Sequence, residues 1–467
     1  MNKYIKYIKE KTGNSKDYIF KSINVSNTDI LLVFNEVLTS SSDVSDFVLR
    51  KILTLSKKEL NDITNHLPSA NIKIIKLDDI FTYLNNGFLI IFINDKILAV
   101  ESRIVLERGI TTIESELSVV GSKDSFSENF NTNLGLIRRR IKSENLWWNE
   151  ITLGKSSKTK VGILYMNGIV DNKIVEEVYQ KLNKINIDGI IDSAYLKDVL
   201  ESNSIFPTVN LTERPDKASQ ALLEGKVVIL VDTTSYCIIL PNFFIDYFHT
   251  VDDYYQKSFN TTLIRIIRVF AFFIAIFIPA YYIAIITYNQ DSIFLSILLL
   301  LKAQRASVPF PATNEALFMI LSFEILRESD LRMSSTTGSA ISILGGLVLG
   351  DAAVSAGIMS PIMIIVIALS SIAGFVFTSI ELVNAIRVYR IIFILLASLL
   401  GIYGIYLGSV FLLYKLITLK SFGKPYLAPF SPFIYKEQKD AIIKTKNTGI
   451  KYRNPLLTKN KKRGEYN

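Results

Sequence analysis

Three glutamates interrupt one stretch within the most apolar third of this 467-residue chain. Glu315, Glu324 and Glu328 lie in the stretch VPFPATNEALFMILSFEILRESDLR, where an ionisable side chain is costly unless paired and therefore marks assembly or function. On a helix, Glu328 and Arg332 stand one turn apart and can form an ion pair. We expect Glu324 to need a different cation, either Arg327 or one from a neighbouring chain.

Two prolines open the same stretch and separate it from the apolar run before it. Proline lacks the N–H group that would extend a preceding helix, but it is tolerated near a helix start. We expect Pro309 and Pro311 to end one segment. A new helix then begins at Thr313 or Asn314 and lies at the cytoplasmic interface or between subunits. The prolines and the three carboxylates are thus predicted to serve assembly or gating.

Small and polar residues recur at roughly helical spacing in the segment 334–360, which is rich in Gly, Ser and Ala. They are Thr337, Ser339, Ser342, Gly346 and Gly350. Several copies of such a stripe can enclose water, and nearby apolar residues such as Ile343 and Val348 can close the path by dewetting. Asp351, if it faces the lumen, favours cations. The stripe, its two apolar neighbours and Asp351 are the predicted pore residues.

The same segment has a second interpretation, in which its small residues serve only the close packing of helices. Asp351 is then a loop residue between two short helices. Packing predicts that a larger residue at Gly346 destabilises the assembly, whereas a pore predicts that a polar residue at Ile343 or Val348 makes it leak.

An arginine cluster, Arg138, Arg139 and Arg140, stands in the sequence IRRRIK. Three consecutive helical residues point in different directions, so at least one can face inward and pair with a carboxylate or a phosphate. The cluster is predicted either to contact another cytosolic domain, a partner subunit or lipid head groups, or to be an ordinary solvated helix face.

Residues for other chemistry are scarce. The single cysteine, Cys237, and the two histidines, His66 and His249, are too few for an internal disulfide or for a typical zinc site. GKSSKT (154–159) looks like the end of a Walker A loop, but it lacks the first glycine and precedes a strand, so we interpret it as a turn. We expect no enzyme activity, no cofactor and no metal site.

The elements that carry these residues lie in two kinds of sequence. Up to about residue 258, charged and apolar residues alternate as in a soluble protein, whereas long apolar runs dominate from 263 to about 419. In the soluble part we predict strands at 28–38 and 161–170, two-strand units at 87–102 and 225–241, and helices at 46–67, 128–148 and 172–185. This alternation is typical of α/β structure, here in two subdomains joined near 107–116.

Apolar runs at 262–288, 362–380 and 391–414 are read as membrane spans, and 292–301 as a tilted or half-crossing helix. With the small-residue segment, we expect four or five membrane segments. Arg265 and Arg268 place the start of the first span in the cytoplasm. Arg387, Arg390 and the basic tail should lie there too, yet a single apolar run separates them. Either one of these two basic regions does not follow the positive-inside rule, or the last apolar run does not cross the membrane as a single span.

The predicted fold class is therefore multi-domain, with a cytosolic α/β region of two subdomains followed by an α-helical transmembrane domain. The expected boundaries are 1–115 and 116–258 for the α/β subdomains, 259–420 for the membrane domain and 421–467 for a basic cytosolic tail. The first twenty residues lack the apolar core of a signal peptide, so the N-terminal region is expected in the cytosol. The net charge of +9 fits a membrane protein rather than nucleic-acid binding, because basic and aromatic residues are not interleaved.

Four blocks of the sequence resemble the A-subunit family of bacterial spore germinant receptors, the GerA family. The first is the proline-initiated, Glu-bearing helix with ILRESDLR. The others are VVGSKDSFSENFNTNLGLIRRRI (119–141), TERPDKASQALLEGKVVILVD (212–232) and GDAAVSAGIMSPIMIIVIALSSIAGF (350–375). The resemblance covers about residues 17–426, and its motifs are long and occur in order.

The resemblance implies a subunit of a nutrient receptor in the inner membrane of the spore. Its partners would be a permease-like B subunit, to which the nutrient site is attributed, and a lipoprotein C subunit. The A subunit would be the homo-oligomeric, ion-conducting part that triggers germination. The alternatives are a sister-family accessory protein of the dipicolinic-acid channel operon, a secondary transporter, or a membrane-anchored enzyme.

Overall fold

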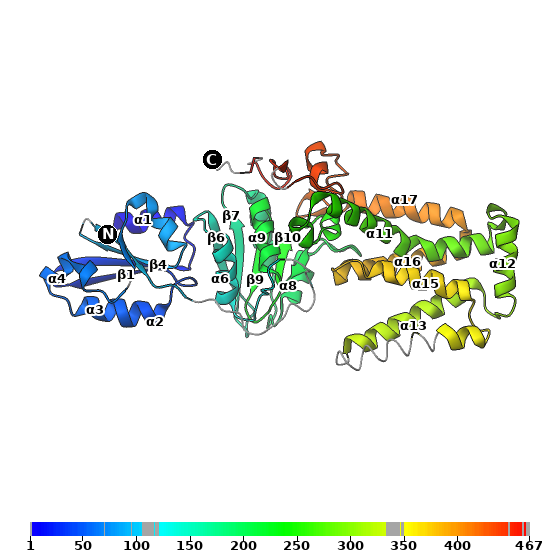
Figure 1. Cartoon of the computed structure of the whole chain (residues 1–467), viewed down its shortest axis with the longest axis horizontal. Coiled ribbons are helices and arrows are strands. Elements are labelled where there is room, and N and C mark those ends of the chain that lie inside the picture. Colours follow the sequence, from blue (N-terminus) through cyan, green and yellow to red (C-terminus); the bar gives the residue numbers. More distant parts are fainter. Residues whose placement is uncertain are drawn as a thin grey trace.

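The structure is a computed structural model that describes residues 2–69, 71–94, 96–104, 116, 121–332, 346, 350–446, 449–459 and 462–463. Two units, each built on a β-sheet, are followed along the long axis of the molecule by a domain of helices (Figure 1). The α/β region and the helical domain predicted from the sequence are confirmed.

The first unit, residues 2–104, is built on a five-stranded sheet in the order β1-β2-β4-β5-β3, and every strand pairing is antiparallel. Its strands are β1 (Tyr18–Val25), β2 (Thr28–Asn35), β3 (Ile72–Ile74), β4 (Phe88–Ile93) and β5 (Lys96–Glu101). All six residues of β4 are buried. The apolar run of this strand does not alternate with polar residues because helices cover both faces of the sheet.

Helices α1 (Asn2–Lys11) and α5 (Ile80–Leu84) cover one face of this sheet, and the segments after β2 cover the other. These segments are α2 (Ser41–Asp43), η1 (Val44–Leu49), α3 (Arg50–Leu53), α4 (Lys57–Asn61) and η2 (Ile63–Asn65), and a short turn η3 (Leu77–Asp79) precedes α5. The single helix predicted over 46–67 is therefore wrong. Both the N–H and the hydroxyl of Ser56 donate to the Glu59 carboxylate, at 2.8 and 2.7 Å, and this capping box starts a new helix.

The second unit, residues 121–257, has a sheet in the order β6-β7-β9-β10-β8, again antiparallel throughout. Its strands are β6 (Leu146–Leu153), β7 (Thr159–Met166), β8 (Asn210–Thr212), β9 (Val227–Val231) and β10 (Cys237–Leu240). Helices α6 (Phe130–Arg140) and α9 (Pro215–Glu224) pack on one face, and α7 (Asn172–Asn183) and α8 (Ser193–Leu200) on the other. The turn η4 (Phe244–Phe248) and α10 (Asp252–Tyr255) lead out of the unit.

The helix predicted over 128–148 ends at Arg140, so that prediction is wrong in its second half. Trp147 and Trp148 lie in β6, and the buried Trp148 ring packs on Phe130 of α6 with 5.4 Å between ring centroids. The indole N–H of Trp148 also donates to Asp17 of the first unit at 2.8 Å. Residues 154–158 form the turn between β6 and β7, as predicted for GKSSKT.

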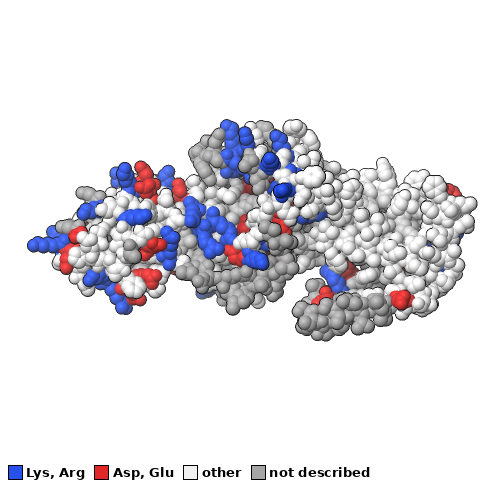
Figure 2. All heavy atoms as spheres, in the orientation of Figure 1, with Lys and Arg blue, Asp and Glu red and all other residues white. Residues whose placement is uncertain are grey.

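The helical domain contains α11 (Ser258–Thr287), α12 (Leu295–Arg305), α13 (Ala312–Arg332), α15 (Pro361–Gly374), α16 (Ile380–Leu400) and α17 (Ile402–Thr418), with a short turn η5 (Gln290–Ser292) before α12. Among the described residues, α11 and α16 are long and apolar enough to cross a membrane, whereas α15 and α17 are shorter apolar helices. Charged side chains cover the two α/β units but are rare on the visible face of the helical domain (Figure 2).

The span predicted over 391–414 is wrong, because a glycine divides it. Gly401 has φ 62° and ψ −141°, which only glycine adopts readily, and it separates α16 from α17. The two helices pack against each other as an antiparallel pair (Figure 1). Arg387, Arg390 and the basic tail therefore lie toward the same end of the bundle, which removes the conflict seen in the sequence.

The span predicted over 362–380 is also too long, since α15 ends at Gly374. The hydroxyl of Ser379 accepts the Leu382 N–H at 3.4 Å and caps a separate helix, α16. After α17 the chain returns to the second unit through a small hairpin, β11 (Lys420–Ser421) and β12 (Lys424–Pro425), and the turn η6 (Tyr435–Asp440). Tyr426 of this tail is fully buried, and its carbonyl accepts the Phe244 N–H at 2.9 Å.

Candidate functional site

Two arginines fasten the first helix of the helical domain to the second unit. Arg265 and Arg268 lie on one face of α11, and both pair with Asp253 of α10 at 2.9 Å. Arg268 also donates to the carbonyl of Phe248 at 2.9 Å and to the hydroxyl of Thr250 at 3.0 Å. Asp253 is only 2% exposed, so the three charges are held together away from water. We call Arg265, Arg268, Asp253 and Asp440 the junction cluster.

The C-terminal tail completes the junction cluster from the other side. Arg265 Nη1 donates to the carboxylate of Asp440 at 3.0 Å and to the carbonyl of Ala441 at 2.9 Å. His249 Nε2 is 2.7 Å from the same carbonyl, which requires the tautomer that carries its proton there. Burial, followed by the charge of Arg265, lowers the pKa of His249 well below its usual value, so the ring is neutral. The start of α11 is thus tied to both the second unit and the tail.

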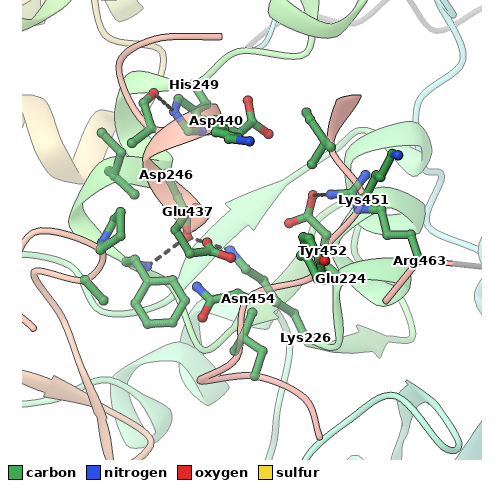
Figure 3. A pocket seen from close by; sticks show the side chains of 18 of the residues that line it. Glu224, Lys226, Asp246, His249, Glu437, Asp440, Lys451, Tyr452, Asn454 and Arg463 are labelled. Carbon is green, nitrogen blue, oxygen red and sulfur yellow. Dashed lines mark hydrogen bonds and ion pairs between the residues drawn. The ribbon is translucent and has the colours of Figure 1, made fainter. Parts of the chain in front are cut away.

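A cavity of about 420 Å³ lies beside the junction cluster, between the second unit and the tail (Figure 3). Its wall combines acidic, basic and aromatic side chains, among them Glu224, Lys226, Asp246, Tyr254, Glu437, Asp440, Lys451 and Arg463. Lys226 and Asp246 form an ion pair at 2.5 Å. Burial, with the charges of Glu224 and Asp440, raises the pKa of Glu437 to about 7. The protonation of this wall therefore changes near neutral pH.

Glu315 of α13 is fully buried and forms a connection to α12 and α15. One carboxylate oxygen accepts the backbone N–H of Ser360 at 2.6 Å and also the hydroxyl of Ser360. The other oxygen lies 3.6 Å from Arg305 of α12. Glu315 thereby joins α12, α13 and the start of α15.

Glu324 has the predicted partner and two more. Arg327 lies 3.8 Å from its carboxylate on the same helix. Arg387 and Arg390 of α16 approach the other carboxylate oxygen to 3.2 and 3.4 Å. Glu328 pairs with Arg332 at 2.6 Å, as predicted.

The helix after the prolines begins within one residue of its predicted start. It starts at Ala312, and the carbonyl of Pro311 accepts the Glu315 N–H at 3.1 Å, while Pro309 lies in the connection after α12. The helix α13 runs beside α15, α11 and α16 (Figure 1), and its expected position at the cytoplasmic interface stays a prediction. Its burial between subunits stays a prediction.

The arginine cluster makes contacts of two kinds. Arg138 is buried and pairs with Asp17 of the first unit at 2.9 Å, so it connects the two α/β units. Arg140 pairs with Asp124 at 2.6 Å, and the half-exposed Arg139 reaches the same carboxylate at 3.3 Å. The role of the cluster in assembly stays a prediction.

Most predicted pore residues lie outside the described part of the chain, namely Thr337, Ser339, Ser342, Ile343 and Val348. The described ones, Gly346, Gly350 and Asp351, are helical, and neither glycine has an atom within 4 Å of where a Cβ would stand. Asp351 is exposed in a helical segment that ends at Ser355, so its placement in a loop is wrong.

The acidic partners of the arginines were missed by the sequence analysis. The sequence does not distinguish Asp17, Asp253 and Asp440 from other acidic residues, because all three lie in polar stretches. One signal was available for Asp253. Arg265 and Arg268 are one turn apart in an apolar run, and the sequence VDDYY just before it holds the nearest carboxylates.

The fold and these connections define a class of protein with two sheet-based units coupled by buried ion pairs to a helical domain. The family model described as Bacillus/Clostridium GerA spore germination protein matches residues 6–456. The chain therefore belongs to the GerA family of spore germination proteins.

Similar proteins are found in several bacilli. The chain is 36% identical to spore germination protein KA of Bacillus subtilis (strain 168), over 95% of this chain and 84% of that protein. It is 35% identical to GerQA of Bacillus cereus, over 97% of this chain and 92% of that protein. A crystal structure of the N-terminal domain of the A subunit of the Bacillus megaterium germinant receptor GerK3 is 28% identical, with a TM-score of 0.40, over 51% of this chain and 94% of that one.

Proposed function

We propose that this chain is the A subunit of a nutrient-sensing spore germinant receptor, in which several copies of its helical domain together enclose an ion path. The family match over residues 6–456 carries the proposal, because it runs through both α/β units and the helical domain. The two membrane-length helices, α11 and α16, support a location in the inner membrane of the spore. The α/β units then face the cytosol.

In this proposal the chain is not an enzyme and takes no cofactor. It works with a permease-like B subunit and a lipoprotein C subunit, and the nutrient is sensed outside the A subunit. The junction cluster gives a physical route for the signal, since Asp253 connects the second unit directly to Arg265 and Arg268 of α11. A shift of the second unit would move α11 without an intervening flexible linker.

Ion flux in reconstituted vesicles tests the proposal. The full chain is reconstituted alone and with its permease-like and lipoprotein partners, and potassium release is followed. Ile343→Asn and Val348→Asn are expected to raise the basal leak with the oligomer intact, because water enters an apolar constriction more readily once it is polar. Gly346→Leu separates the two interpretations of the segment, because dissociation of the oligomer would favour a packing role, whereas an altered flux with the oligomer intact would favour a pore.

Two results would overturn the ion path through the segment 334–360. One is a potassium flux that none of the substitutions changes, including Asp351→Asn. The other is a leak that appears only where the oligomer has dissociated.

A further inference from the structure

The arginines around Glu324 carry more positive charge than their acidic partners in the described part of the chain balance. Arg327, Arg387 and Arg390 all lie within 3.8 Å of the Glu324 carboxylate, so three positive charges meet one negative charge. The nearby Glu328 does not supply the missing charge, because it pairs with Arg332 at 2.6 Å. Among the residues that the structure describes, this group, which we call the α13–α16 arginine cluster, keeps an excess of two positive charges.

The other contacts of these arginines are neutral and leave donors unused. Arg390 Nη1 donates to the hydroxyls of Ser370 and Ser371 at 3.3 Å, and Arg387 Nη1 donates to the side-chain oxygen of Asn384 at 3.0 Å. Arg390 Nε and Arg387 Nη2 are buried and have no hydrogen-bond partner among the described residues. The Arg390 side chain is only 4% exposed. A buried guanidinium without full pairing is costly, so the cluster is suited to receive an anion.

The cluster lies at the level where the helical domain leaves the second unit. Tyr389, between the two arginines of α16, stacks on Phe206 of the second unit with ring centroids 4.9 Å apart. Exposed apolar residues follow directly on α16, namely Ile391, Ile392, Leu395 and Leu399. On α13 the neighbouring Leu321 and Ile325 are also exposed, at 59% and 58%. An apolar surface that begins beside paired arginines is the arrangement expected at a membrane's head-group level.

We propose that the α13–α16 arginine cluster binds a phosphate group, either the phosphodiester of an anionic membrane lipid or free phosphate. The planar guanidinium donates two parallel hydrogen bonds to phosphate oxygens, so Arg387 and Arg390 can hold one group between them. Arg327, Arg387 and Glu324 are 23%, 19% and 32% exposed, which leaves the cluster open on one side. The lipid form rests on the membrane location proposed above, but not on ion conduction.

Native mass spectrometry of the full chain in uncharged detergent tests the site. The probes are phosphatidylglycerol, phosphatidylcholine and inorganic phosphate. Arg387→Gln is expected to weaken phosphatidylglycerol binding at least about tenfold, through loss of a charge-assisted hydrogen bond. Glu324→Gln is expected to strengthen it about fivefold or more, because it removes the competing negative charge. Misfolding cannot produce this gain.

Arg332→Gln is the matched control, because it removes an arginine from the exposed end of α13 outside the cluster. Its phosphatidylglycerol affinity should equal that of the unmodified chain. Binding of phosphatidylglycerol alone supports the lipid as the source, and binding of inorganic phosphate as well supports recognition of the phosphate itself. An equal loss in Arg332→Gln, or no gain in Glu324→Gln, would overturn the proposal. It would also be overturned if Arg387→Gln left lipid binding intact and separated the copies of the chain, since the arginines would then meet a carboxylate of another copy.

Discussion

At the residue scale, a few buried ion pairs between segments far apart in the sequence couple the two α/β units and the helical domain. Arg138 pairs with Asp17 across the two α/β units, and Arg265 and Arg268 share Asp253 at the start of α11. A buried pair contributes little net stability when intact, but removing one partner leaves an uncompensated charge. Such pairs are therefore sensitive positions for the relative placement of the units.

Arg138→Gln should destabilise the full chain far more than Arg139→Gln at the neighbouring position. The Arg138 side chain is 0% exposed, and its loss leaves Asp17 buried without its cation, which costs about 3–5 kcal/mol. Arg139 is 50% exposed, so its loss costs about 0–1 kcal/mol. Thermal unfolding of both variants in detergent, with hydrogen exchange at the β1 amides, measures the difference. Equal unfolding temperatures would mean that the buried pair of Arg138 with Asp17 is no more important for stability than the exposed contact of Arg139.

Asp253→Asn should loosen the start of α11 without changing the α/β units. The substitution keeps the shape of the side chain but leaves Arg265 and Arg268 without their shared carboxylate, again at a cost of about 3–5 kcal/mol. Hydrogen exchange at amides 258–268 should rise, while exchange in β7 and β9 stays unchanged. Asp46→Asn, which removes a half-exposed helical pair with Arg50, is the control. Unchanged exchange at the start of α11 would contradict the coupling role of Asp253.

At the element scale, Gly401 decides how the last two helices run. Its backbone conformation is one that only glycine adopts readily. A Cβ atom there would also stand 2.8 Å from Asn289 Oδ1 and 2.9 Å from Tyr288 Cβ. Gly401→Ala should therefore destabilise the α16–α17 pair by about 1–3 kcal/mol. Gly374→Ala is the control, because no atom lies within 4 Å of its Cβ position. Thermal unfolding in detergent tests this, and a Gly401→Ala variant as stable as Gly374→Ala would refute it.

Elements were predictable where a local pattern decides them. The strands in 87–102 and 225–241 are apolar runs on either side of a polar turn, and both pairs are present. The predictions failed where one residue inside a periodic run changes the outcome, as Ser56 does by capping α4 and Gly401 by ending α16. The partners at the candidate site could not be predicted at all, because Arg265 and Asp440 are 175 residues apart and no periodicity relates them.

At the scale of the whole molecule, the C-terminal tail packs back against the second unit, at the cavity beside the junction cluster. Its contacts bring Asp440 to Arg265 and Glu437 to the cavity wall. Whatever alters the packing of the tail therefore alters the surroundings of α11. The titration of Glu437 provides a way to perturb this packing from within the tail.

Glu437 should make the packing of the tail weaker as pH rises. Its pKa is raised from 4.5 to about 7, first by burial and then by Glu224 and Asp440. Between these values the released tail ionises Glu437 while the packed tail keeps it neutral, so the stabilising effect is full below pH 4.5 and is lost as pH rises to about 7. His249 acts in the opposite direction. Because its pKa is lowered in the packed state, the packing becomes weaker as the pH falls below 6.5, the usual pKa of a histidine.

Glu437→Gln separates these two effects, because glutamine stays neutral at every pH. At about pH 8 the variant should show slower hydrogen exchange in residues 435–445 than the unmodified chain. At about pH 4 the two should agree, since Glu437 is then mostly neutral in both the packed and the released tail. Glu10→Gln, which changes an exposed glutamate of α1, should match the unmodified chain at both values. If hydrogen exchange in residues 435–445 were faster in Glu437→Gln than in the unmodified chain at about pH 8, the ionised Glu437 carboxylate would be stabilising the packed tail. The pH response of the junction would then have to arise from His249.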